Sequence, residues 1–426
     1  MKKQDRVLLV LTMAMVALGL VIAGCDLGGN GDEATNQITG VVRDAGSGEL
    51  VAAVTVSFGN SNATTGADGS FSLDLGASSG VVIDDFSVYG SGYISRFVAQ
   101  APVDASQSTS LTIYLDRIDV STYTLHQFDL TVEDETNTEI STGSYVMGAV
   151  LNTNGGFSTF EINNYANPGT NTVYTAAFGS DCLIAVHAYT MSTDFVAMAR
   201  QLDLSAVSSN QTLTGTVGTS VSVTPDTPGN YGMLMLQSPY GGLEVFADQI
   251  TTSPDSITIY NPYNYDGFWA QAFLDTTPPD SEKMYISTSS VGPIGSSVAL
   301  PALNLTLGPS GGYPAGYSIS YSAPTLSFDT VSDALVYVLF VWDQATGDEL
   351  AVIFSFGASV TLPSWLVTEL SGTTADVMLI TQDSSGNADL AAFSRLGSYP
   401  PETQLGVALE NGGTDYADGY LQTINF

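Results

Sequence analysis

The sequence contains few basic residues, two histidines and only two cysteines. Lysine and arginine together number 9 against 43 acidic residues, which gives a formal net charge of −34. This charge repels nucleic acid, so we expect no nucleic-acid partner. A zinc site needs three or four nitrogen, sulfur or oxygen ligands, and His126 and His187 stand in no His-x-x-x-His pattern. We therefore expect no cofactor and no metal site.

Long amphipathic helical patterns are also missing. After residue 25, no long stretch repeats apolar residues at i, i+3, i+4 and i+7 behind a capped start. Short runs rich in valine, isoleucine, threonine and aromatics recur instead, separated by glycine, asparagine, aspartate and proline. The chain is 44% hydrophobic and too long for one core. These patterns predict an all-β chain of tandem antiparallel β-sandwiches, Ig-like or prealbumin-like.

The N-terminus has the pattern of a secretory signal, a basic start followed by the apolar run 7–23. The segment Leu-Val-Ile-Ala-Gly-Cys at 20–25 resembles the bacterial lipobox. The resemblance implies cleavage before Cys25 and a lipid on its sulfur, hence a membrane-anchored lipoprotein of the cell envelope, periplasmic or surface-exposed. The alternative is an uncleaved transmembrane segment, since the run has the length of a short spanning helix.

The acidic excess and the second cysteine each carry an expectation. Adaptation to high salt and divalent-cation binding both explain the acidity, and the scarcity of lysine and the even spread of acids favour the first. With Cys25 lipidated, Cys182 has no partner for an intrachain disulfide. Its apolar neighbours predict a buried side chain.

Residues 38–117 contain, in this order, a hairpin, a glycine-flanked Asp turn and a Gly-Tyr pair. The matching segments are Ile38–Val42 with Asp44, Thr65–Leu73, and Gly90–Tyr93. They resemble the carboxypeptidase regulatory-like family, a small prealbumin-like β-sandwich, although Ala52-Ala53 stands where the family has Gly-Ala. The resemblance implies a spacer or binding module without chemistry of its own.

Two further segments suggest repeated or familiar units. Residues 131–140 line up with residues 41–50, which is either a diverged internal repeat or a generic hairpin. The order Pro324–Phe328, Tyr337–Trp342 and a hairpin at 343–348 resembles a fibronectin type III-like module.

These features, together with Pro/Gly-rich turns near residues 225 and 310, divide the chain into six expected segments. They are a signal peptide (1–24), a lipidated cysteine with a flexible Gly-rich tether (25–37), a carboxypeptidase regulatory-like sandwich (38–117), a β-sandwich of unknown family (118–225), a β-rich domain of unknown family (226–310) and a fibronectin type III-like sandwich (311–426).

Catalytic motifs are weak. Residues 76–80 match Gly-x-Ser-x-Gly, but a nucleophile elbow needs a following helix, and the run 81–86 reads as a strand. The acidic clusters 84–85 and 133–135 lack a complete calcium-loop pattern, so we interpret them as solvated turn carboxylates. We expect no enzyme active site.

The strongest binding candidate is the aromatic segment 260–269, with Tyr260, Tyr263, Tyr265 and Trp269 beside amide and carboxylate groups. Such rings stack on sugars, or alternatively pack into the end of a sandwich, and we favour packing because aromatic side chains usually bury. The lipobox, the regulatory-like segment and the lack of a catalytic pattern lead us to hypothesise a non-enzymatic binding, adhesive or structural module toward cell-surface polysaccharide or an envelope protein. The alternatives are an unrecognised enzyme within 118–310, perhaps carbohydrate-active, or a lipoprotein subunit of an envelope transport assembly.

Overall fold

The computed structural model describes residues 37–76, 81–105, 109–133, 138–162, 165–189, 195–214, 316–384 and 414–426 with short gaps, and the strands between 219 and 300 as backbone. The described chain is all-β, as predicted, apart from a 3₁₀ turn η1 (Val120–Thr122) and a helix α2 (Ser364–Leu370). Among these residues no helix has the length and apolar character needed to cross a membrane.

Unit 1 is a two-sheet sandwich. β1 pairs antiparallel with β4 and parallel with β7, and the second sheet has the order β3-β2-β5-β6. Both sheets contribute to one core, which contains Val42, Val56 and Leu73. The strands are β1 (Gln37–Asp44), β2 (Thr55–Phe58), β3 (Ser61–Thr64), β4 (Ser70–Asp74), β5 (Val81–Tyr89), β6 (Ser95–Asp104) and β7 (Thr109–Leu115).

Unit 2 repeats this topology. β8 pairs antiparallel with β11 and parallel with β14, and the other sheet has the order β10-β9-β12-β13. Its strands are β8 (His126–Glu133), β9 (Tyr145–Leu151), β10 (Phe157–Ile162), β11 (Thr172–Thr175), β12 (Cys182–Tyr189), β13 (Phe195–Leu202) and β14 (Asn210–Thr214).

Unit 3 repeats it again at the level of the backbone. β15 pairs antiparallel with β18 and parallel with β21, beside the order β17-β16-β19-β20. Its strands are β15 (Thr219–Pro225), β16 (Tyr231–Gln237), β17 (Glu244–Phe246), β18 (Ile257–Asn261), β19 (Trp269–Asp275), β20 (Tyr285–Val291) and β21 (Ser297–Leu300). The expected boundary at 225 falls after β15, which is the first strand of unit 3, so it lies inside this unit and not before it. The expected boundary near 310 lies outside the described residues.

The backbone register supports the repeat reading of residues 41–50 and 131–140. Val42 and Val132 are both fully buried. The carbonyl of Val42 accepts the N–H of Val51 at 2.9 Å, and that of Val132 accepts the N–H of Ile140 at 3.1 Å. The turn of unit 2 is therefore one residue shorter, so that Ile140 corresponds to Val51 rather than to Leu50.

Unit 4 differs from units 1–3 in one strand. Its sheets have the orders β22-β23-β26 and β28-β27-β24-β25. In the smaller sheet, β22 precedes the central strand β23 and pairs with it antiparallel, at the edge where units 1–3 have their last strand in parallel pairing. The strands are β22 (Ile319–Ser322), β23 (Thr325–Phe328), β24 (Val336–Asp343), β25 (Glu349–Ser355), β26 (Ser359–Thr361), β27 (Thr374–Ser384) and β28 (Thr414–Asn425).

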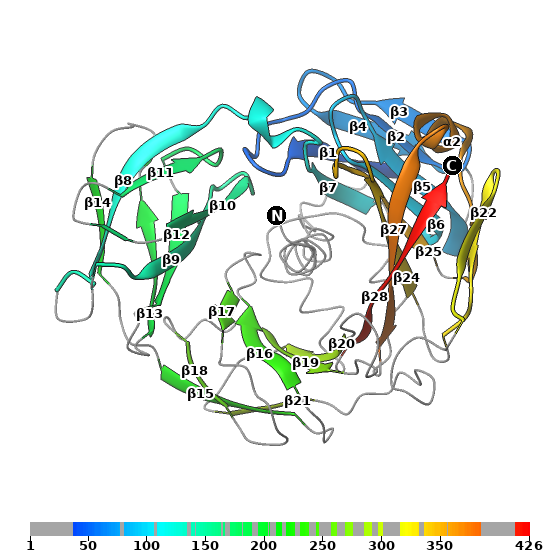
Figure 1. Cartoon of the computed structure of the whole chain (residues 1–426). Coiled ribbons are helices and arrows are strands. Elements are labelled where there is room, and N and C mark those ends of the chain that lie inside the picture. The colour runs from blue at the N-terminus through cyan, green and yellow to red at the C-terminus, as the bar shows by residue number, and fades with distance from the viewer. Residues whose placement is uncertain are drawn as a thin grey trace.

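Sheets of three units join into one of 12 strands. β20 of unit 3 pairs with β28 of unit 4, and β25 of unit 4 pairs in parallel with β6 of unit 1. The first and last units of the chain are therefore neighbours, and the four units follow one another around a ring (Figure 1). We call the contact between β6 and β25 the closing interface.

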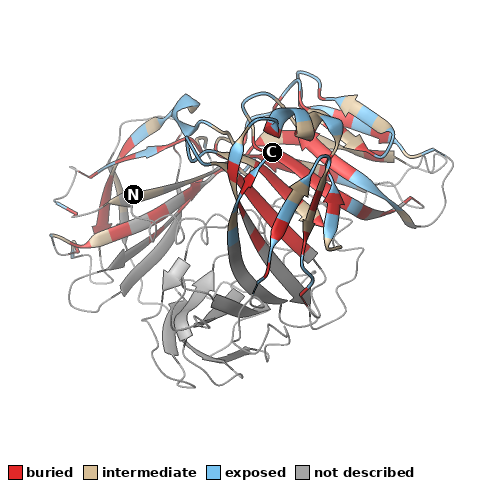
Figure 2. Ribbon diagram, turned by 45° about the vertical axis from the view of Figure 1, so that its right-hand side comes forward, coloured by how far each residue is buried: buried red, intermediate tan, exposed pale blue. Residues whose placement is uncertain are grey.

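The segment before β2 is buried in unit 1 without forming a strand. Val51 and Val54 are buried, but β2 begins only at Thr55 because Ala53 has a positive φ of 60° that interrupts extended structure. Figure 2 shows the buried residues concentrated on the paired strands.

Candidate functional site

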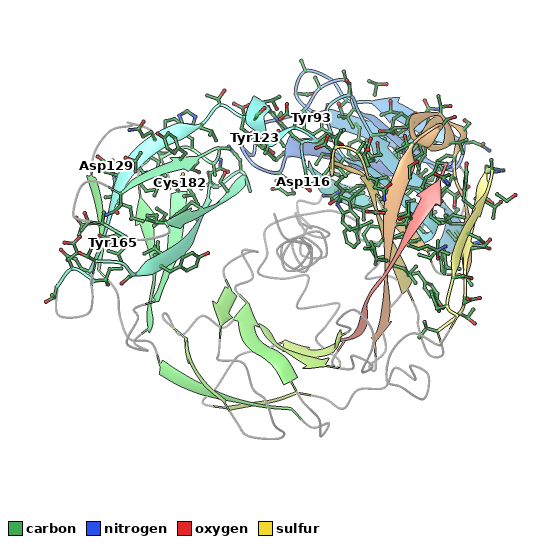
Figure 3. All side chains as sticks on the ribbon, viewed as in Figure 1. Tyr93, Asp116, Tyr123, Asp129, Tyr165 and Cys182 are labelled. Atoms are coloured by element: carbon green, nitrogen blue, oxygen red, sulfur yellow. The ribbon has the colours of Figure 1, made fainter. Side chains whose placement is uncertain are left out.

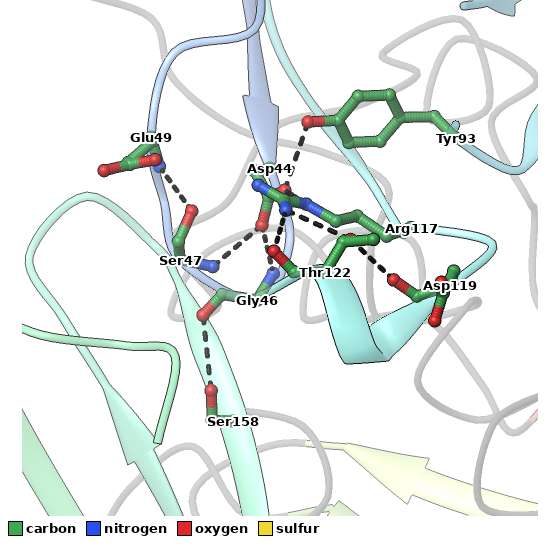
Figure 4. Close-up of polar contacts among 9 residues, drawn as sticks. All are labelled: Asp44, Gly46, Ser47, Glu49, Tyr93, Arg117, Asp119, Thr122 and Ser158. Atoms are coloured by element: carbon green, nitrogen blue, oxygen red, sulfur yellow. Dashed lines mark hydrogen bonds and ion pairs between the residues drawn. The ribbon is translucent and has the colours of Figure 1, made fainter. Parts of the chain in front are cut away.

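Asp44 lies at the centre of the most connected polar cluster among the described residues. It ends β1, and only 1% of its surface is exposed. One carboxylate oxygen, Oδ1, accepts the N–H groups of Gly46 and Ser47 at 3.0 and 2.9 Å. Gly48 closes the same turn with a φ of 77°, a conformation that favours glycine. The carboxylate thus fixes the turn between β1 and β2 (Figure 4).

The other carboxylate oxygen of Asp44 bonds to the end of unit 1. Its Oδ2 accepts a hydrogen bond from Arg117 Nε at 2.6 Å and one from the Tyr93 hydroxyl at 3.2 Å. Burial disfavours the Arg117 cation, but the hydrogen bond to Asp44, the Asp44 charge and the two nearby tyrosines together outweigh this and raise the pKa of the guanidinium. Arg117 also lies 4.5 Å from the centre of the Tyr123 ring.

The two tyrosines of the cluster stay neutral. Burial, together with the Asp44 charge, raises the pKa of both Tyr93 and Tyr123. Figure 3 shows both rings with Asp116 in the region where units 1 and 2 meet. The hydroxyls therefore act as fixed hydrogen-bonding groups rather than as acids.

The turn that Asp44 fixes is also the contact with unit 2. Asn152 Nδ2 donates to the carbonyl of Ser47 at 2.7 Å, and the Tyr114 hydroxyl donates to the carbonyl of Asn154 at 2.9 Å. A Cβ on Gly156 would lie 2.2 Å from the carbonyl carbon of Ser47, so the two backbones meet too closely for a larger residue. We call this cluster the Asp44 joint.

A second polar cluster lies at the closing interface. Arg96 of β6, 9% exposed, forms an ion pair with Asp116 at 2.9 Å. Glu349 of β25 lies close enough to both that their charges affect its titration. Ser95 Oγ donates to Glu369 Oε2 at 3.1 Å, and Tyr89 stacks on Trp365 with ring centres 4.1 Å apart.

Three of the chain's scarce arginines are used in these clusters. Arg96 and Arg117 each pair with an aspartate, and Arg43 donates to the carbonyl of Gly48 at 2.8 Å. Asp44 already accepts four hydrogen bonds, so its carboxylate has no free lone pair aimed at a substrate. The Asp44 carboxylate therefore serves to hold units 1 and 2 in position, and it is not available as a general base, a nucleophile or a metal ligand.

The structure describes two of the sequence-predicted binding residues, and only by their backbone. Tyr260 lies in β18 and Trp269 begins β19, which belong to different sheets. Tyr263, Tyr265 and Cys25 lie outside the described residues. Sequence reasoning quoted Asp44 only as part of a family pattern and missed Arg117. The available signal was an arginine in a chain that has almost none.

The remaining motifs carry no described chemistry. β5 begins at Val81, directly after the Gly-x-Ser-x-Gly segment, so a strand stands where an elbow needs a helix. His126 stacks on Phe178 with ring centres 3.7 Å apart. Cys182 is fully buried, as its neighbours predicted. Over the described ranges, no group of three His, Cys, Asp or Glu side chains is placed to hold a metal ion.

Comparison with known proteins gives only distant likenesses. No protein-family model and no curated protein matches the chain, so the family resemblances of residues 38–117 and 311–426 stay predictions. The solved structures that match include the TIE protein of Bacillus anthracis (10% identity, 62% of this chain and 51% of that one, TM-score 0.16). They also include the shaft pilin SpaA of Lactobacillus rhamnosus GG (8%, 42% and 96%, 0.14) and a Ca²⁺-stabilised adhesin of an Antarctic bacterium (10%, 92% and 98%, 0.15).

The chain is thus distantly similar to bacterial surface pilins and adhesins built from β-sandwiches. It spans about half the length of the TIE protein chain. With TM-scores this low, the likeness carries no conclusion about activity, ligand or partner.

Proposed function

We propose that this chain is a non-enzymatic, envelope-anchored lipoprotein whose tandem sandwiches form a rigid module that binds or supports cell-surface polysaccharide or an envelope protein. The observation that supports it is the Asp44 joint. There the buried charged groups of unit 1 bond to each other and to a turn that contacts unit 2. Such use of scarce charges suits a scaffold that holds surfaces in fixed positions, and it leaves those groups unavailable for catalysis.

The proposed lipid anchor can be tested at Cys25. Full-length chain expressed in bacteria with labelled palmitate is expected to incorporate label, and Cys25→Ser is expected to lose it, because the thiol is the attachment point. Cys182→Ser is the matched control and keeps the label, since that sulfur is buried in unit 2. Equal labelling of wild type and Cys25→Ser contradicts the anchor.

The proposed binding role can be tested on the aromatic segment. The full-length chain in detergent is expected to be retained on insoluble cell-wall polysaccharide at about 1 M salt, where surface electrostatics are screened. The double variant Tyr263→Ala/Tyr265→Ala is expected to bind about thirtyfold more weakly, since each of the two lost aromatic contacts contributes about 1 kcal/mol. Tyr174→Ala, at a ring that is 54% exposed in unit 2, is the control.

Three outcomes separate the alternatives. Retention that the double variant loses and the Tyr174 control keeps supports polysaccharide binding through this segment. No retention of a folded chain contradicts it. Release of soluble sugar during the incubation favours an enzyme within residues 118–310.

A further inference from the structure

The closing interface joins two units that lie far apart in the sequence. β25 and β6 pair in parallel from Ala351 opposite Ser95 to Ser355 opposite Ala99. Unit 4 also shares its core with β6, through Phe97 and Ala99. No covalent link spans this contact in the described chain, so the ring is held closed here by non-covalent contacts, namely strand pairing, side-chain packing and the Ser95–Glu369 hydrogen bond.

Carboxyl groups outnumber guanidinium groups at this interface. From unit 4, β25 contributes Glu349, which accepts a hydrogen bond from Trp342 of β24, and α2 contributes Glu369. From unit 1, β6 contributes Arg96, and the segment after β7 contributes Asp116. Behind Asp116, the pair of Asp44 and Arg117 is already matched.

Arg96 cannot neutralise both nearby carboxylates. Its Nη2 is bonded to Asp116, and its Nε is buried with no hydrogen-bond partner among the described residues. Although 39% of the Asp116 side chain is exposed, the protein around its carboxyl group removes water and raises its pKa. The charge and hydrogen bond of Arg96 lower the pKa of Asp116, but not enough to cancel this rise. One cation thus faces two acids across the boundary between units.

Although the surface of Glu349 is only partly buried, the protein around its carboxyl group removes water and raises its pKa to about 8, and the Asp116 charge adds to the effect. Burial also raises the pKa of Glu369. A carboxyl group whose folded-state pKa is raised stabilises the folded arrangement while it keeps its proton. That contribution is complete below the unfolded value of 4.5 and declines as the pH rises through about 8.

We propose that the closing interface is a pH-sensitive contact, which holds units 1 and 4 together while Glu349 is protonated and opens as the carboxyl groups facing Arg96 become charged. Opening separates β6 from β25 and leaves unit 4 attached to unit 3 through β28 and β20. The chain then changes from a closed ring to an open arc in mildly alkaline surroundings. This inference concerns shape and does not depend on which ligand the chain binds.

Hydrogen exchange of the full-length chain, read by mass spectrometry at pH 6 and pH 8.5, tests the proposal. Protection factors, which correct for the intrinsic pH dependence of exchange, are expected to fall more than about tenfold in β25 and β6, because each pH unit below the raised pKa changes the opening equilibrium by up to about tenfold. The core strand β12 of unit 2 is expected to keep its protection. The fluorescence emission of Trp365 is expected to shift, because the Tyr89 ring that stacks on it moves away when the interface opens.

Two variants separate this mechanism from general destabilisation. Glu349→Gln keeps a hydrogen-bond acceptor for Trp342 and is expected to remove the pH dependence in β25 and β6. Asp348→Asn deletes the same charge one residue earlier, at an exposed turn position, and is expected to behave as wild type. The proposal is overturned if wild type protects β25 equally at both pH values, if Glu349→Gln loses as much protection as wild type, or if β12 opens in parallel.

Discussion

Replacing Phe97 with alanine is expected to lower the free energy of unfolding by about 3–5 kcal/mol, the range for deleting a buried aromatic ring. Phe97 is 1% exposed. Although it belongs to β6 of unit 1, its ring packs in the core of unit 4, beside residues such as Leu339 and Ile353. The loss should therefore appear in unit 4, as reduced hydrogen-exchange protection of β24 and β27.

Phe86 offers a matched control for that substitution. It lies on the neighbouring strand β5, is 5% exposed, and packs in the core of unit 1. Phe86→Ala is expected to cost a similar free energy but to reduce protection in β1 and β7. If Phe97→Ala instead destabilises unit 1 and leaves unit 4 unchanged, the assignment of Phe97 to the core of unit 4 is wrong.

Asp44→Ala is expected to destabilise the chain by about 3–5 kcal/mol, as for a buried ion pair that loses one partner. The change leaves Arg117 without its carboxylate and frees the N–H groups of Gly46 and Ser47. Because the turn contacts Asn152 of unit 2, the substitution should also loosen the joint between units 1 and 2. A urea titration of the full-length chain measures the stability change.

Unit 4 contains the same turn without the joint. Asp343 Oδ1 accepts the N–H groups of Ala345 and Thr346 at 2.7 and 3.3 Å, and Gly347 has a φ of 78°. This turn bonds to no arginine among the described residues. Asp343→Ala is therefore expected to cost only about 1 kcal/mol, the typical value of a lost side-chain cap.

The difference between these two substitutions isolates the contribution of burial and the Arg117 ion pair. Equal costs for Asp44→Ala and Asp343→Ala would mean that Asp44 acts only as a turn cap. In that case the Asp44 joint would contribute no rigidity, and the scaffold role proposed for the chain would lose its main support.

The strand β6 illustrates what a sequence pattern can and cannot specify. The continuous apolar run at 97–99 is typical of a strand buried on both faces. The pattern does not say which unit covers the second face. In the structure Phe97 and Ala99 face unit 4, while Val98 and, after a positive φ of 56° at Gln100, Ala101 face unit 1.

The Asp44 joint was only partly accessible from the sequence. The Asp-x-Gly-Ser-Gly spacing indicates a capped turn, because a short acidic side chain bonds N–H groups two and three residues on. An aspartate four residues before a glycine recurs at Asp343 and Gly347, where the aspartate caps a similar turn in a different setting. Only the fold brings Arg117, 73 residues away, against one of these aspartates and not the other.

The sequence by itself determined the all-β class, the turns and the inward faces of individual strands, because alternation and turn chemistry act between near neighbours in the chain. In β4, Phe71 and Leu73 are buried and Ser70, Ser72 and Asp74 are exposed for that reason. The tertiary structure alone decided which strand edges meet, and therefore that the last unit closes on the first through β25 and β6. Edge strands pair through backbone groups that every residue carries, so the choice of partner depends on three-dimensional placement and not on local sequence.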